Sequence, residues 1–256
     1  MLGLNDYIVF LDSGVGGISV LREAVKVMPN ENFIYFGDSA NAPYGEKPTE
    51  VIREIMDANV KKFVEDGAKC VVIACNTATG AAARYLREKY PNLPVIGVEP
   101  ALKPAVEHNN GGHVVVMATP LTLKQDKFLS LFNTYKDSAD ITLVPCSGLM
   151  QFVERGELDG ERLNEYLCEK LKKAKEKKID AVVLGCTHYP FVKDAVIKAI
   201  GYDVEIDDGA VGTAKEIKRR IEKYGVSSSS EEKGKVIFLN SKDESMVKLS
   251  EMLFKL

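Results

Sequence analysis

In Lys69-Cys70-Val71-Val72-Ile73-Ala74-Cys75-Asn76-Thr77, a β-branched apolar run ends on a small residue, a cysteine and two polar side chains. The same pattern recurs in Asp180-Ala181-Val182-Val183-Leu184-Gly185-Cys186-Thr187-His188. Each apolar run predicts a buried strand. Residues just beyond the carboxyl ends of strands line the ligand crevice of an open α/β sheet. The sequence therefore predicts two thiols, Cys75 and Cys186, in two equivalent crevice positions.

Further apolar runs give the expected fold class. Together with the two above, the predicted strands are Tyr7–Leu11, Phe33–Phe36, Cys70–Ala74, Val95–Val98, Val114–Ala118, Ile141–Val144, Ala181–Gly185, Val204–Ile206 and Val236–Leu239. Helical patterns lie between them, and this alternation predicts an α/β protein with mostly parallel sheets. These strands are too many for the simplest single sheet, so we expect two similar α/β lobes. Each lobe is a mostly parallel sheet flanked by helices, with the active site in the cleft between them.

Local signals predict several element boundaries. Thr49 is expected to cap the helix that follows it, and Asp66-Gly67 to end that helix. Glu161–Lys178 predicts one amphipathic helix with a solvated, lysine-rich face. Ser227–Lys235 is polar and predicts a surface loop.

Composition excludes several classes of protein. The chain has 256 residues and a net charge of −3, which argues against a nucleic-acid-binding surface. No apolar run is long enough to span a bilayer, and the N-terminus lacks the features of a signal peptide. We therefore expect a cytoplasmic protein without a membrane partner, whose cysteines are free thiols. His108, His113 and His188 are scattered, so the sequence predicts no metal site.

Two further segments have the composition of binding loops. Phe10–Gly17 is a glycine-rich turn after the first strand, and such turns present backbone N–H groups to anions. Within it, Asp12 can hold an ammonium group or orient a thiol, although capping the next helix would also explain it. Gly37–Gly45 is long and rich in small residues, which suits either a binding loop or an ordinary Pro-Tyr-Gly turn.

The setting of Cys75 and Cys186 favours catalysis. Each follows a strand and lies among amide, hydroxyl or imidazole side chains, which can lower the pKa of a thiol. His188 is two residues from Cys186 and can exchange a proton with it or hold it by a hydrogen bond.

The other cysteines are expected to be inert. Cys70 lies inside a strand and Cys168 inside a helix, where a buried cysteine behaves as a small hydrophobe. Cys146 follows a strand without polar neighbours, which indicates a structural role.

Two equivalent acid–base groups suit a reaction that treats both faces of a substrate alike, as racemisation does. Two other classes remain open: a thiol redox or metal-binding protein, and an amino-acid-binding module without turnover. The absence of a Cys-x-x-Cys spacing argues against the first of these.

Taken together, the motifs resemble the glutamate racemase family of the cofactor-independent aspartate/glutamate racemase superfamily. The resemblance covers most of the chain. It rests on Asp12–Gly17, Gly37-Asp38 with Pro43-Tyr44-Gly45, Ala74–Ala78, Gly97–Pro100, Ala118–Thr122 and Leu184–Pro190.

The resemblance implies a two-base mechanism without a cofactor. One cysteine, as thiolate, removes the α-proton of glutamate, and the other, as thiol, protonates the opposite face. In the family, the first cysteine usually takes the proton from D-glutamate and the second from L-glutamate. Asp12 would assist Cys75, while His188 and Glu154 would assist Cys186.

The resemblance also implies the substrate contacts and the division of the chain. The expected substrate-binding residues are Asp12, Ser13, Pro43, Tyr44, Gly45, Asn76, Thr77, Thr119, Thr122, Thr187 and His188. Residues 98–207 would form one lobe, and residues 1–97 with 208–256 the other. The product, D-glutamate, would supply peptidoglycan synthesis. An aspartate racemase of the same superfamily is the alternative, and a homodimer is left open.

Overall fold

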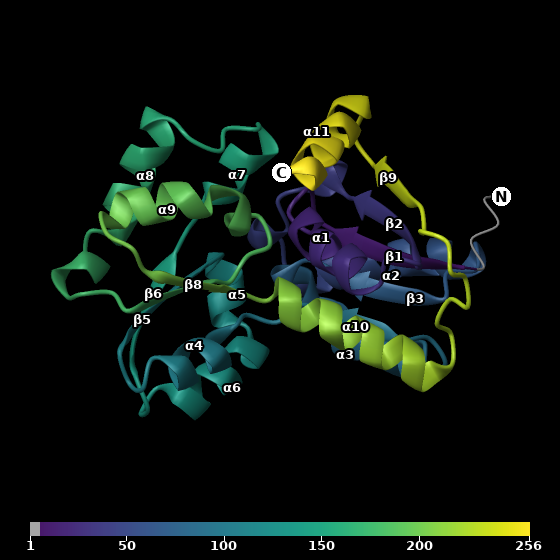
Figure 1. Ribbon diagram of the computed structural model, residues 1–256, viewed down its shortest axis with the longest axis horizontal. Helices are drawn as coiled ribbons and strands as arrows, with labels where there is room; N and C mark the ends of the chain where they lie inside the picture. Colours follow the sequence, from purple (N-terminus) through teal and green to yellow (C-terminus); the bar gives the residue numbers. More distant parts are fainter. Residues whose placement is uncertain (1–5) are drawn as a thin grey trace. The chain divides into compact units, whose positions relative to one another are not determined.

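The computed structural model describes residues 6–256, which divide into two compact units (Figure 1). The first unit runs through Glu99 and resumes with Ala210–Leu256, and the second unit is Pro100–Gly209. The family resemblance implies passages between the units after residues 97 and 207. Because the chain passes between the units twice, the first unit is built from two separate stretches of chain.

The first unit contains a five-stranded parallel sheet in the order β4-β3-β1-β2-β9. Its strands are β1 (Tyr7–Asp12), β2 (Asn32–Gly37), β3 (Cys70–Ile73), β4 (Val95–Gly97) and β9 (Val236–Asn240). β3 is buried along its whole length and β1 at every residue but its first. Helices cover both faces of such a sheet, which is why its central strands are continuous apolar runs.

Five helices flank this sheet. They are α1 (Ile18–Val27), α2 (Thr49–Glu65), α3 (Asn76–Lys89), α10 (Ala210–Tyr224) and α11 (Glu244–Lys255). α1 packs against α10 and α11, whereas α2 packs against α3. These two groups lie on opposite faces of the sheet. Crossovers between parallel strands are right-handed, so a connection that runs toward β2 and β9 places its helix on one face. A connection that runs toward β3 and β4 places its helix on the other face.

The second unit contains a four-stranded parallel sheet in the order β6-β5-β7-β8. Its strands are β5 (His113–Ala118), β6 (Asp140–Pro145), β7 (Ala181–Leu184) and β8 (Glu205–Asp208). The helices are α4 (Leu102–His108), α5 (Pro120–Lys124), α6 (Asp126–Tyr135), α7 (Leu149–Glu154), α8 (Glu161–Leu171) and α9 (Lys193–Ile200). α4 and α6 pack together beneath the sheet in Figure 1, and α8 packs on α9 above it.

Each sheet has one point at which the direction of the crossovers reverses. In the first unit this switch point lies between β1 and β3, and in the second between β5 and β7. At a switch point the loops after the two strands diverge, which opens a crevice beyond their carboxyl ends. Cys75 follows β3 and Cys186 follows β7. Each thiol therefore lies beyond the carboxyl end of its strand, beside the switch point of its own sheet.

The chain makes a close approach at each switch point, and each requires a glycine. A Cβ on Gly17 would meet the Cβ of Ala74 at 2.6 Å, and a Cβ on Gly185 would meet that of Ala118 at 2.9 Å. Ala74 and Gly185 are the residues immediately before the two cysteines. In the first unit the residue before the cysteine is alanine and the facing residue is glycine. In the second unit the residue before the cysteine is glycine and the facing residue is alanine.

The predicted strands and fold class are confirmed, and the helix that begins at residue 49 ends at Glu65 beside Asp66-Gly67 as predicted. The capping role of Thr49 is wrong. Pro48 occupies the capping position with an extended backbone, its carbonyl accepts from the Ile52 N–H at 3.1 Å, and Thr49 is the first helical residue.

The single helix predicted over Glu161–Lys178 is also wrong. α8 ends at Leu171, and a short 3-10 helix follows over Ala174–Glu176. Only Ala174 of the Lys172–Lys178 stretch is buried. One small apolar residue gives a helical extension too little packing to hold it.

The polar Ser227–Lys235 segment contains no helix or strand, as predicted, but it is anchored. The Ser228 N–H donates to the buried carboxylate of Glu31 at 2.7 Å. Glu31 also pairs with the side chain of Lys69, which in turn pairs with Asp6.

Candidate active site

Cys75 is the N-cap of α3, and its surroundings suit a thiolate. Its Sγ accepts from the Ala78 N–H at 3.5 Å and lies 3.5 Å from Ser13 Oγ. α3 extends over Asn76–Lys89, so its positive N-terminal end points at the sulfur. A helix N-terminus lowers the pKa of a thiol placed there, because it favours the negative form. Asn76 and Thr77 form the first turn of this helix beside the thiol and are buried.

Asp12 ends β1 and holds the glycine-rich turn in place. Its Oδ1 accepts from the Gly14 N–H at 2.7 Å, and the Tyr35 hydroxyl donates to the Gly14 carbonyl at 2.8 Å. The side chain is buried, with 2% of its residue exposed. Of the alternatives left open by the sequence, the helix-capping role is not seen, since α1 begins after Gly17 and has no side-chain cap.

Asp38 is a buried carboxylate that sequence reasoning did not select. It accepts from the Tyr44 hydroxyl at 2.7 Å and from the Asn41 side-chain amide at 3.0 Å. Burial raises the pKa of Tyr44 strongly, and Asp38 and then the charges of Cys75 and Asp12 raise it further. The tyrosine is therefore held neutral, and its hydroxyl proton is directed at Asp38.

Tyr44 begins a short 3-10 helix over Tyr44–Glu46, preceded by Pro43 in an extended conformation. This segment packs against α3. The predicted substrate contacts Pro43, Tyr44 and Gly45 thus belong to the same unit as Cys75. A signal for Asp38 was present in the sequence, because it follows β2 as Asp12 ends β1.

Cys186 has a different environment, built around an imidazole. Its Sγ lies 3.7 Å from Nδ1 of His188, and Nε2 of His188 lies 2.7 Å from Oε1 of Glu154. Burial by itself lowers the pKa of His188, but the hydrogen bonds to Cys186 and Glu154 and their charges raise it well above the ordinary value. The three side chains form a chain from carboxylate to imidazolium to sulfur. Glu154 ends α7, so the fold brings it to a residue 34 positions away.

The remaining predicted residues of the second unit lie after β5 and β7. Thr119 caps α5, where its Oγ1 accepts a hydrogen bond from the Thr122 N–H at 3.1 Å. The Thr119 hydroxyl donates in turn to Thr122 Oγ1 at 2.9 Å. Thr187 is buried between Cys186 and His188. Because β5 pairs with β7, these hydroxyls share the carboxyl edge of the sheet with Cys186.

The other cysteines differ from these two in burial and surroundings. Cys70 is completely buried in β3, and burial raises the pKa of its thiol strongly. Burial also raises the pKa of Cys146 to about 12, so this thiol stays protonated. The backbone carbonyl of Cys146 accepts from the Tyr189 hydroxyl at 3.1 Å. Cys168 was expected to be a buried hydrophobe, and this is wrong, because α8 turns it to solvent.

Metal-ligating side chains do gather once in the described part of the chain. The three histidines stay apart, as their spacing indicated, but His108 lies with Glu205 and Asp207. The sequence expectation of no metal site rested on the absence of a doublet spacing and the scatter of the histidines, neither of which detects carboxylates that the fold brings to one of them. Within residues 6–256, no helix is long and apolar enough to cross a membrane.

Comparisons with known proteins agree on one family. The Asp/Glu/hydantoin racemase family matches residues 19–226. A glutamate racemase of Clostridium botulinum (strain Alaska E43 / Type E3) is 49% identical over 252 residues, which cover 98% of each chain.

Two solved structures extend this similarity to the fold. The glutamate racemase of Francisella tularensis in complex with D-glutamate has a TM-score of 0.84 at 27% identity and covers 98% of this chain and 94% of that one. The Escherichia coli glutamate racemase in complex with L-glutamate and the activator UDP-MurNAc-ala has a TM-score of 0.85 at 26% identity, with 98% and 95% covered.

Proposed function

The chain belongs to the Asp/Glu/hydantoin racemase family, among its glutamate racemases, and from that premise we propose that Cys75 and Cys186 are the two acid–base catalysts. The observation that carries the proposal is the equivalent placement of the two thiols. Each follows a central strand at the switch point of its own sheet, and each has neighbours that favour a thiolate.

The proposed reaction consists of two proton transfers at the α-carbon of glutamate. A thiolate removes the α-proton, so that an S–H bond forms, the C–H bond breaks, and its electron pair stays on the α-carbon. The thiol of the other cysteine then gives its proton to the opposite face. Atoms and charges balance, and the two cysteines have exchanged protonation states. In the direction from L- to D-glutamate, Cys186 is the base and Cys75 the acid, and in the reverse direction the roles change over.

The assisting groups follow from the contacts. His188 and Glu154 would hold the negative charge of Cys186 and accept or return a proton through the imidazole. The N-terminus of α3 and the Ser13 hydroxyl would hold the negative charge of Cys75. Asp12, buried at the end of β1, would assist Cys75 and hold the substrate ammonium, whose positive charge stabilises the adjacent carbanion.

The substrate carboxylates would be held by neutral donors. Backbone N–H groups, hydroxyls and amides bind carboxylates without adding a competing acid. The proposed donors are Ser13, Tyr44, Gly45, Asn76, Thr77, Thr119, Thr122 and Thr187, and Pro43, which has no N–H, would contact the substrate through its ring.

The test is α-proton exchange in D2O with reduced protein and no added pyridoxal phosphate. We expect both enantiomers of glutamate to racemise and to take up deuterium at the α-carbon, while L-aspartate does neither. Racemisation of aspartate alone would overturn the substrate assignment but leave the two-thiol chemistry intact. Tight binding of glutamate without exchange would contradict catalysis altogether.

The biological role proposed is the supply of D-glutamate for peptidoglycan synthesis in the cytoplasm. Its support is the 49% identity to a bacterial glutamate racemase over nearly the whole chain. Expression of the chain should restore growth of a bacterial strain that requires added D-glutamate. A version with both Cys75→Ser and Cys186→Ser is the matched control, and growth with that version would contradict the role.

A further inference from the structure

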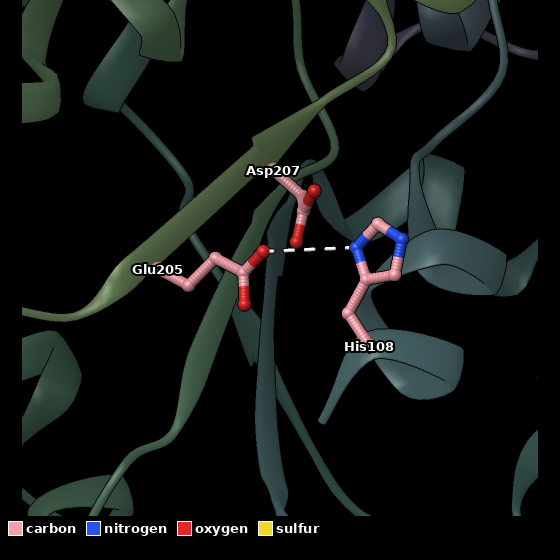
Figure 2. A group of neighbouring side chains, drawn as sticks. All are labelled: His108, Glu205 and Asp207. Carbon is pink, nitrogen blue, oxygen red and sulfur yellow. Dashed lines mark ion pairs between the residues drawn. The ribbon is translucent and has the colours of Figure 1, made fainter. Parts of the chain in front are cut away.

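His108, Glu205 and Asp207 meet at the edge strand of the second sheet, and none of them is among the residues assigned to the racemase chemistry. His108 is the last residue of α4, while Glu205 and Asp207 lie two positions apart on β8. Residues two apart on a strand project from the same face. Figure 2 shows both carboxylates turned toward the imidazole. One ligand atom from each side chain lies within 4.8 Å of the other two, and Nδ1 of His108 is 3.7 Å from Oε1 of Glu205.

One carboxylate oxygen of the group has no hydrogen-bond partner among the described residues. This atom, Oδ2 of Asp207, is buried. Within residues 6–256, no lysine or arginine pairs with Glu205 or Asp207. A buried carboxylate oxygen without a partner costs free energy, because it has lost water and gained nothing. A bound cation at this position would replace the missing interaction.

One of the carboxylates is held in place by a neighbour outside the group. The Asn109 side-chain amide donates to Oε2 of Glu205 at 3.1 Å and to the Ala105 carbonyl at 2.9 Å. Oε1 of Glu205, the oxygen nearer His108, is left to point at the group. Hydrogen bonds of this kind orient the ligands of metal sites and raise their affinity.

We propose that His108, Glu205 and Asp207 bind a divalent transition-metal ion of the zinc class. One imidazole nitrogen and two carboxylate oxygens are a donor set typical of such ions, with a further position left for water. Bonds of about 2.1 Å in a tetrahedron place ligand atoms about 3.4 Å apart. The 3.7 Å separation is close to this value, and the exposed His108 and Glu205 side chains are free to close the remaining distance around Asp207.

The positions of the ligands along the chain suggest what the ion does. α4 is the first helix after the chain enters the second unit, and β8 is its last strand before the chain leaves. A metal ion would join these two elements and so hold together the two ends of the second unit. A ligand that binds only the folded state raises the unfolding temperature. We assign the ion the role of holding α4 to β8, because none of its ligands is among the residues assigned to the proton transfers.

The test is a titration of the reduced, full-length protein with Co²⁺, followed by thermal unfolding with Co²⁺ and with Zn²⁺. We expect binding of one ion with a d–d absorption spectrum that lacks sulfur-to-metal charge transfer. We also expect a higher unfolding temperature with either ion. His108→Ala and Asp207→Asn should each weaken binding at least tenfold and remove the thermal shift. Glu107→Gln, which removes a neighbouring exposed carboxylate of α4 outside the group, is the matched control and should bind normally.

Three results would overturn the proposal. They are no saturable binding, binding that His108→Ala and Asp207→Asn leave unchanged, and a charge-transfer band showing that the ion sits on cysteine sulfur. Racemisation is not among the readouts, so the metal site and the proposed catalytic mechanism can fail independently.

Discussion

The two cysteines occupy equivalent positions in their sheets, but the polar group beside each comes from a different place. The strand registers pair Leu11 with Ile73 and Met117 with Leu184, which aligns Cys75 with Cys186. By the same alignment, Asp12 corresponds to Ala118, and His188 corresponds to Thr77. The first unit thus takes its carboxylate from the neighbouring strand, and the second takes its imidazole from the segment of the cysteine itself.

This difference teaches that one topology can stabilise a thiolate in two ways. Cys75 has a helix N-terminus and a hydroxyl, whereas Cys186 has an imidazolium backed by a carboxylate. The two enantiomers have equal free energy in an achiral solvent, so kcat/KM must be equal in both directions of racemisation for every variant. The asymmetry can therefore be measured only in one-sided exchange, where a single cysteine works alone.

The largest effect is expected when either thiol is removed. Cys75→Ser and Cys186→Ser should each lower racemisation by about 10³-fold or more, since an alcohol is a far weaker acid–base group than a thiol. Slow α-proton exchange should survive with retention of configuration, for L-glutamate in Cys75→Ser and for D-glutamate in Cys186→Ser. NMR in D2O measures both. Cys168→Ser, on an exposed helix face, is the matched control and should be fully active. Full racemisation in either of the first two variants would disprove the mechanism.

The next effect separates the two environments. In a Cys75→Ser background, His188→Gln should lower the exchange of L-glutamate by about 10²-fold, because the imidazole is a positioned acid–base group. In a Cys186→Ser background, Ser13→Ala should lower the exchange of D-glutamate much less, because α3 still stabilises Cys75. Equal losses in the two backgrounds would show that the environments are functionally the same.

A third effect concerns the exchanged glycine and alanine at the switch points. Gly185→Ala brings a methyl group to 2.9 Å from the Cβ of Ala118, so it should lower the unfolding free energy by about 1–3 kcal/mol. Adding Ala118→Gly removes the methyl group that the new side chain meets and should restore part of that loss. Denaturant unfolding of both single variants and the double variant measures the coupling. Strictly additive losses would mean that the two positions do not share one contact.

The smallest effect is a change of stability with pH. The pKa of His188 is raised in the folded state, so its stabilisation is fully present below its unfolded pKa of about 6.5 and is lost as the pH rises through the folded-state value. The difference in unfolding free energy between the wild type and His188→Gln should therefore be largest below about pH 6.5 and shrink at higher pH. A difference that grows with pH would show that His188 is neutral in the folded protein.

The central strands β1, β3, β5 and β7 were predictable from the sequence because each is a short apolar run that the fold buries on both faces. The same rule placed Cys75 and Cys186 at strand ends, and it would have found Asp38 if applied to β2. Contacts that depend on tertiary packing were not accessible in this way. Glu154 was selected only through the family resemblance, and the approach of Glu205 and Asp207 to His108 had no local signal. Thr49 failed as a cap because proline before it supplied the required backbone conformation.

The discontinuity of the first unit has a consequence for synthesis of the chain. β9 pairs with β2 in a register that joins Val236 to Phe33, so the first sheet lacks its edge strand until β9 has been synthesised, about 200 residues after β2. The second unit is one continuous stretch of chain and can fold during translation, before the first unit is complete. Through that interval β2 is an open sheet edge able to pair with other nascent chains. Pairing of β9 with β2 therefore ends the period in which this edge is open.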